Sequence, residues 1–345
     1  RTMRFTPLVV IESVPQVIAF IVSLPLALYF KDYRVMLWII TIQAVTTVIL
    51  SFVFAERRFS IRLNKVYLNR IFSFGWPLML NGLLMFGIFQ ADRGIVGIAY
   101  SMEDLGWFSA AFTLTLFPTI IFMRTAQNLM TPMISRHQNN TAQLELSAVA
   151  SIKAFLILGM LICVGLGLGG PSLSVVLFGE KYLAGAYIIP WLALMQGIRM
   201  IKAGPTTVAI ACGMTKLPLY SNMVRSLAIP LALFSVWKGW GVFGIVMSGI
   251  AGEVLSFMCF MYLLRRITKV DFSRLYLFYF IIALLITVAL FVSLEFVTAL
   301  NPVLEILGAC LFSLFALFLS LVFARDLINW VRTSDRNNDA DSVIS

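Results

Sequence analysis

Polar side chains recur at helical spacing inside apolar segments of this sequence. Arg124, Gln127 and Asn128 occupy positions i, i+3 and i+4, so they share one face of a helix. Polar groups within an apolar span usually face the interior of a helix bundle or a water-filled cavity, and Arg and Lys are the usual partners of phosphate. The residues that we expect to bind an anionic substrate in such a cavity are Arg124, Gln127, Asn128, Arg199, Lys202, Asn222 and Arg225.

Some of these cations have an alternative explanation, which is a position at the membrane surface. Arg124, Arg199 and Lys202 come near the inner ends of their apolar runs, where a long basic side chain can reach the headgroups. Arg225 also comes close to an inner end, but its neighbour Asn222 makes a purely interfacial role less favourable. The sequence leaves both interpretations open.

Carboxylates within the apolar runs are the second group of interest. Glu12 and Glu253 are candidates for coupling to Na⁺ or H⁺, and the alternative is a protonated or hydrogen-bonded group between helices. Asp92 and Arg93, in the stretch FGIFQADRGIVGIAY, fall in the outer third of a span. Adjacent residues point about 100° apart on a helix, so we do not expect these two to pair mainly with each other. We expect contacts that stabilise a gate or a lobe, and direct binding of the substrate is the alternative.

The sequence offers little for metal or redox chemistry. Its four cysteines are single residues within apolar runs, and its one histidine, His137, lies in the polar stretch SRHQNNTAQLE. We expect no catalytic residues, no metal site and no cofactor, with coupling to Na⁺ or H⁺ as the open question.

The elements that must position these residues are membrane-spanning helices. The chain has 345 residues, of which 60% are hydrophobic and 12% are charged. Soluble domains carry about a quarter charged residues, and a spanning helix needs about 20 mostly apolar residues. The composition therefore predicts an all-α integral membrane protein with about ten transmembrane helices. The expected spans are 6–30, 35–55, 71–97, 106–131, 150–177, 184–211, 217–237, 241–264, 275–297 and 303–324.

Basic residues set the expected orientation. With the N-terminus in the cytoplasm, most of the 26 lysines and arginines lie on the inner side of the membrane, as the positive-inside rule requires. Both ends of the chain are then cytoplasmic. The formal net charge of +10 is explained mainly by this topology, so we do not expect nucleic-acid binding.

Two parts of the sequence resemble each other. Residues 7–58 and 218–266 each begin near a Pro-Leu pair, contain two spans and close near an Arg pair. Four spans lie between them, which predicts a six-helix unit in parallel repeat, although convergence of two helix pairs is the alternative. The expected domains are the last two helices of an N-terminal lobe (1–55), a basic cytoplasmic linker (56–70), a six-helix C-terminal lobe (71–266), two additional helices (267–330) and a disordered tail (331–345).

Several short motifs appear in a recognisable order along the chain. They are Gly75-Trp76-Pro77, Asp92-Arg93, Gly106 with Ser109–Ala111, Phe178–Lys181, and Gly213 with Thr215 and Lys216. With these motifs the chain resembles the O-antigen and exopolysaccharide flippases of the multidrug/oligosaccharidyl-lipid/polysaccharide exporter superfamily. The resemblance implies a transporter of two six-helix lobes followed by two extra helices. The chain, which has no initiator Met, would be its C-terminal part, helices 5–14.

The resemblance also implies an activity. It is the flipping, by alternating access, of undecaprenyl-pyrophosphate-linked oligosaccharide across the bacterial inner membrane. The expected partners are this lipid-linked glycan and the lipid bilayer, with a polysaccharide polymerase and chain-length proteins as further candidates. Two alternatives stay open: a Na⁺- or H⁺-coupled drug or metabolite exporter of the same superfamily, and a membrane-embedded polysaccharide polymerase. The short outer loops disfavour an enzyme.

Overall fold

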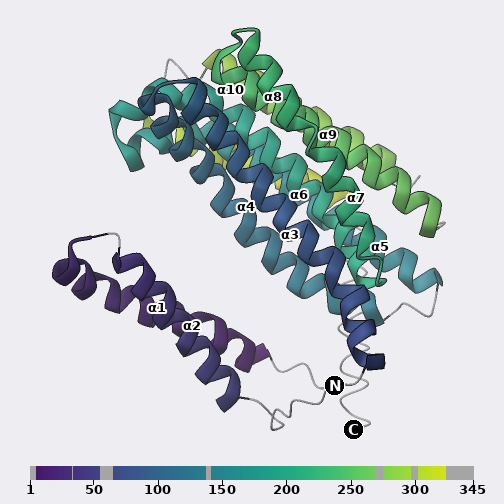
Figure 1. Ribbon diagram of the computed structural model, residues 1–345. Helices are drawn as coiled ribbons and strands as arrows, with labels where there is room; N and C mark the ends of the chain where they lie inside the picture. The colour runs from purple at the N-terminus through teal and green to yellow at the C-terminus, as the bar shows by residue number, and fades with distance from the viewer. Residues whose placement is uncertain are drawn as a thin grey trace. The chain divides into compact units, whose positions relative to one another are not determined.

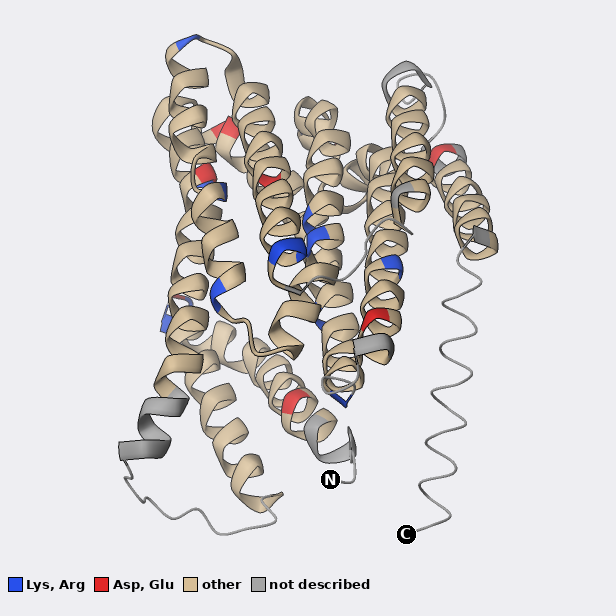
Figure 2. Ribbon diagram, turned by 90° about the vertical axis from the view of Figure 1, so that its right-hand side faces the viewer, with Lys and Arg blue, Asp and Glu red and all other residues tan. Residues whose placement is uncertain are grey.

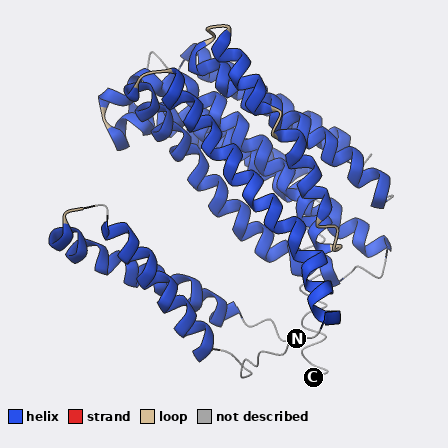
Figure 3. Ribbon diagram, viewed as in Figure 1, coloured by secondary structure: helices blue, strands red, loops and turns tan. Residues whose placement is uncertain are grey.

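The computed structural model describes residues 5–32, 34–54, 65–136, 141–268, 275–296 and 302–323, and every regular element in these ranges is a helix (Figure 3). Nine helical segments in these ranges are long and apolar enough to cross a membrane, and the further apolar helix Leu277–Ser293 is shorter. Together they correspond to the ten expected spans. The protein is a multi-pass membrane protein of the all-α class, as the sequence predicts.

The chain divides into two units, Arg1–Leu68 and Asn69–Ser345. The first unit contains α1 (Phe5–Phe30) and α2 (Arg34–Val53), which pack against each other as a helical hairpin (Figure 1). Lys31 follows α1 with a φ of 48°, the left-handed conformation that commonly ends a helix. Most side chains of the two helices are exposed, as expected for helices surrounded by lipid.

In the second unit, α5 (Thr141–Phe178) and α6 (Ile189–Ala211) pack extensively against each other. They approach closely because glycines lie where the helices cross: a Cβ atom on Gly159 would lie 2.8 Å from the carbonyl oxygen of Gly197. Small residues at such crossings allow membrane helices to pack backbone against backbone. The glycine-rich stretch 159–170 therefore supplies part of a packing surface.

The remaining helices of this unit pack on this pair or on its neighbours. These are α3 (Lys65–Ala99), α4 (Met102–Arg136), the 3₁₀ helix η1 (Glu180–Ile188), α7 (Lys216–Arg225), α8 (Ala228–Trp237), α9 (Gly241–Thr268), α10 (Tyr276–Phe296) and α11 (Pro302–Phe323). The helices α10 and α11 both pack on α5 and expose large apolar side chains elsewhere. Such faces are suited to contact with lipid.

One span is broken in the middle. The helix α7 ends at Arg225 and α8 begins at Ala228, two residues before Pro230. Proline has no N–H to bond the carbonyl of Ser226 four residues earlier, and this carbonyl instead accepts a 3.0 Å hydrogen bond from the N–H of Ile229. The break places Arg225 at the end of a half-helix within the span.

The end of the expected linker 56–70 is helical in the structure. The helix α3 begins at Lys65, so residues 65–70 are helical and continue directly into the span. The sequence from Lys65 contains neither proline nor glycine before Gly75, so nothing interrupts the helix between its polar start and its apolar part. Linker residues 56–64, His137 and the expected tail 331–345 lie outside the described residues.

Candidate functional site

Three basic side chains lie buried halfway along their helices. Arg199 and Lys202 are in the middle of α6, and Arg225 is in the middle of the α7–α8 span. Their relative exposure is 3%, 7% and 2%, respectively. Basic residues in Figure 2 are seen part-way along the helices as well as at their ends. The alternative that Arg199 and Lys202 reach the headgroups is therefore wrong, because both side chains point into the bundle.

Glu253 of α9 neutralises part of this charge. Its Oε1 atom lies 2.7 Å from Nε of Arg199 and 2.8 Å from Nη2 of Arg225, and its Oε2 atom lies 3.2 Å from Nζ of Lys202. The carboxylate is completely buried. A buried charge is tolerated only when it is paired and hydrogen-bonded, and here one carboxylate contacts three cations. The four residues define what we call the charge cluster: Arg199, Lys202, Arg225 and Glu253.

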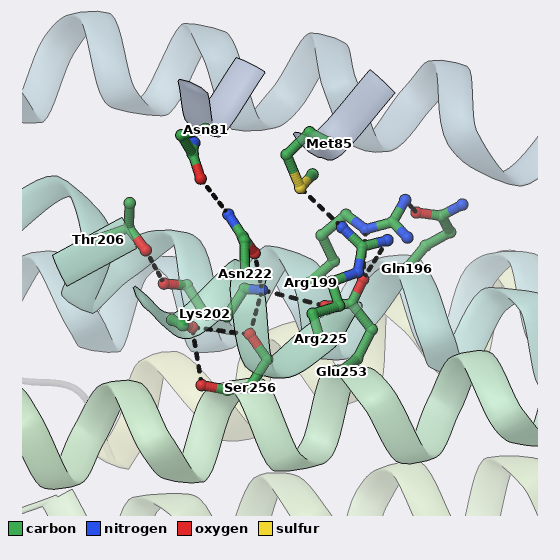
Figure 4. Close-up of polar contacts among 11 residues, drawn as sticks. Asn81, Met85, Gln196, Arg199, Lys202, Thr206, Asn222, Arg225, Glu253 and Ser256 are labelled. Atoms are coloured by element: carbon green, nitrogen blue, oxygen red, sulfur yellow. Dashed lines mark hydrogen bonds and ion pairs between the residues drawn. The ribbon is translucent and has the colours of Figure 1, made fainter. Parts of the chain in front are cut away.

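The ammonium group of Lys202 has all its donors satisfied (Figure 4). Besides Glu253, it donates to Oδ1 of Asn222 at 3.0 Å and to Oγ of Ser256 at 2.9 Å. Lysine has three N–H donors and no acceptor, so these three oxygens complete its hydrogen bonding. Ser221 supports this arrangement through a 2.7 Å contact between its hydroxyl and that of Ser256.

The two guanidinium groups are less well satisfied. Arg199 donates from Nη1 to Oε1 of Gln196 at 2.6 Å, but its Nη2 atom is buried with no hydrogen-bond partner. The Nε2 atom of Gln196 is also buried without a partner. Arg225 directs Nη1 at the thioether sulfur of Met85, 2.9 Å away, which is a weak acceptor. This side of the charge cluster therefore has more donors than acceptors, which suits an anionic ligand.

The helix α3 covers the arginines. The aromatic ring of Phe89 lies 4.5 Å from Cζ of Arg199 and 5.1 Å from Cζ of Arg225, within the range of cation–π contact. Asn81 accepts a 2.7 Å hydrogen bond from Nδ2 of Asn222, so α3 and α7 are joined across the site (Figure 4). The cluster is closed to solvent in this conformation.

Asp92 and Arg93, the two neighbouring charged residues of α3, interact with different parts of the bundle. Asp92 is buried and interacts electrostatically with Arg225 and Arg199, so it extends the charge cluster. Arg93 donates a 3.1 Å hydrogen bond to Oγ1 of Thr113 and lies over the ring of Phe112 at 5.3 Å. The two side chains hold α3 to different neighbours.

The structure does not bring every expected residue to this site. Arg124 and Asn128 are exposed on α4, and Gln127 beside them is half-buried. Glu12 is exposed on α1, in the other unit. The role of these residues stays a prediction. Conversely, Met85 and Phe89 were not predicted as site residues, because apolar side chains within an apolar span cannot be distinguished by sequence from those that contact lipid.

The cluster has the chemistry of an anion site. Among the described residues, no group of three or more His, Cys, Asp and Glu side chains is placed to hold a metal ion. Three cations face one contacting carboxylate, with Asp92 as a further buried acid. Arginine is well suited to phosphate because its planar fork of donors matches two phosphate oxygens.

A comparison with known proteins identifies the family. Residues 1–186, more than half of the chain, match the family described as polysaccharide biosynthesis protein. The chain belongs to this polysaccharide biosynthesis protein family. Over 148 residues it is 27% identical to the amylovoran biosynthesis protein AmsL of Erwinia amylovora, and the aligned part covers 43% of this chain and 38% of AmsL. The membership confirms the resemblance that the sequence motifs carry.

The fold of this family member is similar to that of a solved transporter. The lipid II flippase MurJ, in an inward closed conformation, superimposes with a TM-score of 0.65 and 15% sequence identity. The superposition covers 90% of this chain and 66% of MurJ, so the chain spans less than two thirds of the length of either protein. At this identity the likeness establishes the fold alone, and it agrees with the predicted all-α membrane-protein class.

Proposed function

We propose that the protein moves a polyprenyl-diphosphate-linked oligosaccharide across the membrane by alternating access. The observation that carries this proposal is the charge cluster, in which Arg199, Lys202 and Arg225 are buried halfway along candidate membrane-spanning segments. Charged residues inside a membrane are costly and mark the path of a substrate or ion. An anionic headgroup would repay that cost.

The chemistry of a lipid-linked sugar matches this arrangement. Its diphosphate needs cationic partners while it crosses the apolar core, and its polyprenyl tail can stay in the surrounding lipid. Under-satisfied donors on Arg199, Gln196 and Arg225 supply such partners. A cationic drug would instead be repelled by the excess of positive charge, which disfavours the alternative of a drug exporter.

The related proteins support the same substrate class. The relative from Erwinia amylovora is named for the biosynthesis of amylovoran, and the structural neighbour is named as a flippase of lipid II. We extend the transport of a lipid-linked saccharide to this chain, for the synthesis of O-antigen or exopolysaccharide. In this proposal the protein is a transporter and not an enzyme.

The closed state of the site fits alternating access. Met85 and Phe89 of α3 cover the arginines, and the α7–α8 break leaves Arg225 at the end of a half-helix. Movement of α3 away from α7 would open the cluster to one side of the membrane. Broken helices next to a site near the bilayer midplane are common in transporters.

We place the protein in the bacterial inner membrane, with both ends of the chain in the cytoplasm. The distribution of lysine and arginine over the loops supports this orientation. The proposed partners beyond the glycan are a polysaccharide polymerase and chain-length proteins. Coupling to Na⁺ or H⁺ is part of the proposal; both oxygens of Glu253 contact cations in this conformation, which disfavours binding of either ion to this carboxylate while those contacts last.

Deletion of the gene tests the proposed function. We expect the deletion strain to accumulate the lipid-linked glycan in the cytoplasmic leaflet, where an impermeant glycan-modifying reagent reaches it only after the membrane is opened. Accumulation of unpolymerised units on the periplasmic side would overturn the proposal, because that result would place the protein after the flipping step. Restoration of surface polysaccharide by the plasmid-borne gene is the control.

A further inference from the structure

The charge cluster has two halves that differ in their hydrogen bonding. In the first half, Lys202 donates to Asn222, Ser256 and Oε2 of Glu253, so its donors are used completely. In Figure 4 this half lies toward Asn81 and Thr206, while Met85, Arg199 and Gln196 lie together at the other side. Lys202 therefore has no donor free for a ligand without losing a partner that it already has.

The second half contains the arginines and lacks acceptors. Arg199 Nη2 and Gln196 Nε2 are buried without partners, and Arg225 Nη1 is directed at a thioether. An unpaired buried donor costs free energy, roughly 1–3 kcal/mol and more for a charged group. The one strong acceptor in contact with both guanidinium groups is Oε1 of Glu253, at 2.7 and 2.8 Å.

We propose that Glu253 is an internal counter-anion, which occupies Arg199 and Arg225 until a diphosphate group takes over these two arginines. In the same proposal Lys202 is a positioning residue that keeps hold of Glu253 through Oε2 and does not bind the substrate. The inference rests on the proposed function in taking a diphosphate as the ligand. The sequence predicts the same substrate-binding role for all three cations, whereas this inference gives Lys202 a different role from the two arginines.

Charge balance supports this division of roles. Lys202 and Glu253 neutralise each other as a pair, which leaves the two arginines, with the buried Asp92 near them, as the source of net positive charge for the ligand. A diphosphate offers several anionic oxygens at the spacing of guanidinium donors, whereas Glu253 Oε1 is a single atom shared by both arginines. Exchange of one anion for another also keeps the arginines paired inside the membrane in both states, which avoids an unpaired buried charge.

The test measures binding of inorganic pyrophosphate to the purified protein in detergent, by isothermal titration calorimetry. We expect Glu253→Gln to bind pyrophosphate about tenfold more tightly than the unmodified protein, because the competing charge is gone. We expect Arg199→Gln and Arg225→Gln to bind it at least about tenfold more weakly, as the loss of a charge-assisted hydrogen bond implies. Lys238→Gln, at the exposed end of α8, is the control for a general loss of positive charge.

A double variant keeps the inference testable if Glu253→Gln folds poorly. Lys202→Met/Glu253→Gln removes one positive and one negative charge, so the net charge of the cluster is unchanged. If Lys202 only positions Glu253, this double variant binds pyrophosphate more tightly than the unmodified protein. If Lys202 is itself a ligand of the diphosphate, the double variant binds more weakly, and that result would overturn the inference.

A second ligand separates this inference from the proposed function. Farnesyl diphosphate and farnesol carry the same tail, and only the first has the anionic head. We expect the variants to alter the affinity for farnesyl diphosphate as they alter that for pyrophosphate, and to leave binding of farnesol unchanged. If the Glu253 variants bind pyrophosphate more tightly, the counter-anion role is supported. If the protein then shows no flipping of the lipid-linked glycan, the proposed transport function is contradicted while the counter-anion role is not. Unaltered pyrophosphate affinity in both Glu253 variants would contradict the counter-anion role itself.

Discussion

Gly252 of α9 packs directly against the backbone carbonyl of Arg225 at the end of α7. A Cβ atom at position 252 would lie 3.0 Å from that carbonyl oxygen and 2.7 Å from the Cβ atom of Ala228. The absence of a side chain therefore lets α9 reach the α7–α8 break. Glu253, the next residue, is brought by this approach to the guanidinium group of Arg225, 2.8 Å away.

This packing predicts that Gly252→Ala lowers stability. The added methyl group meets backbone and a neighbouring Cβ atom, neither of which can turn aside, and overpacking of this kind costs about 1–3 kcal/mol. Gly249→Ala is the matched control on the same helix, because its new Cβ atom would meet only the sulfur of the flexible Met195 side chain, at 2.8 Å. Thermal unfolding in detergent compares the two variants. Equal melting temperatures would show that the close contact at position 252 is unimportant.

The buried carboxylate predicts a second effect on stability. Glu253→Leu leaves Arg199, Lys202 and Arg225 without their shared partner, and removal of one member of a buried ion pair costs about 3–5 kcal/mol. We expect a large fall in melting temperature. Lys202→Met/Glu253→Gln should recover much of the loss, since it removes a cation with the carboxylate. A double variant less stable than Glu253→Leu would show that the three cations are balanced by other groups.

The hydrogen bond between Asn81 and Asn222 predicts control of access to the cluster. A hydrogen bond contributes about 0.5–1.5 kcal/mol, so we expect Asn81→Leu to increase opening of α3 about two- to tenfold. The rate at which a water-soluble maleimide labels Met85→Cys, with the four native cysteines replaced, measures this opening. Gln90→Leu, on an exposed position of α3, is the control. If Met85→Cys is labelled at the same rate with and without Asn81→Leu, the hydrogen bond between Asn81 and Asn222 does not hold α3 closed.

Arg124 and Arg225 are expected to differ in their effects. Arg225→Ala removes a buried partner of Glu253 and should lower both the melting temperature and the surface polysaccharide. Arg124→Ala changes an exposed side chain, so it should change the free energy of unfolding by no more than about 0.5 kcal/mol and leave the melting temperature nearly unchanged. It should still lower the amount of surface polysaccharide. Immunoblots give the protein level in each strain. Normal polysaccharide at a normal level of the Arg124→Ala protein would remove Arg124 from the substrate path.

The spans could be predicted because hydropathy is a property of consecutive residues. The ten apolar segments follow from length and composition. The boundaries were less certain because polar helix ends such as the start of α3 at Lys65 extend beyond the apolar part. Local sequence carries no signal for where such an extension begins.

The partners within the site could not be predicted in the same way. Helical spacing shows that Arg124 and Gln127 share a face, but it does not show toward which neighbour that face turns. The contacts of Glu253 join α6, α7 and α9, whose residues are far apart in the sequence, and they depend on close packing at glycines such as Gly252. A carboxylate considered for ion coupling therefore proved to lie among three cations.

The most direct test of the central claim is a flipping assay in proteoliposomes. The substrate is a polyprenyl-diphosphate-linked oligosaccharide with a fluorescent sugar, and a membrane-impermeant reductant reports how much of it reaches the outer leaflet. We predict flipping by the unmodified protein well above that of protein-free vesicles, and a rate lower by about tenfold or more for Arg199→Gln/Arg225→Gln, which lacks both guanidinium partners of the diphosphate. Flipping by this folded double variant at the unmodified rate would contradict the claim that the buried arginines carry the headgroup across the membrane.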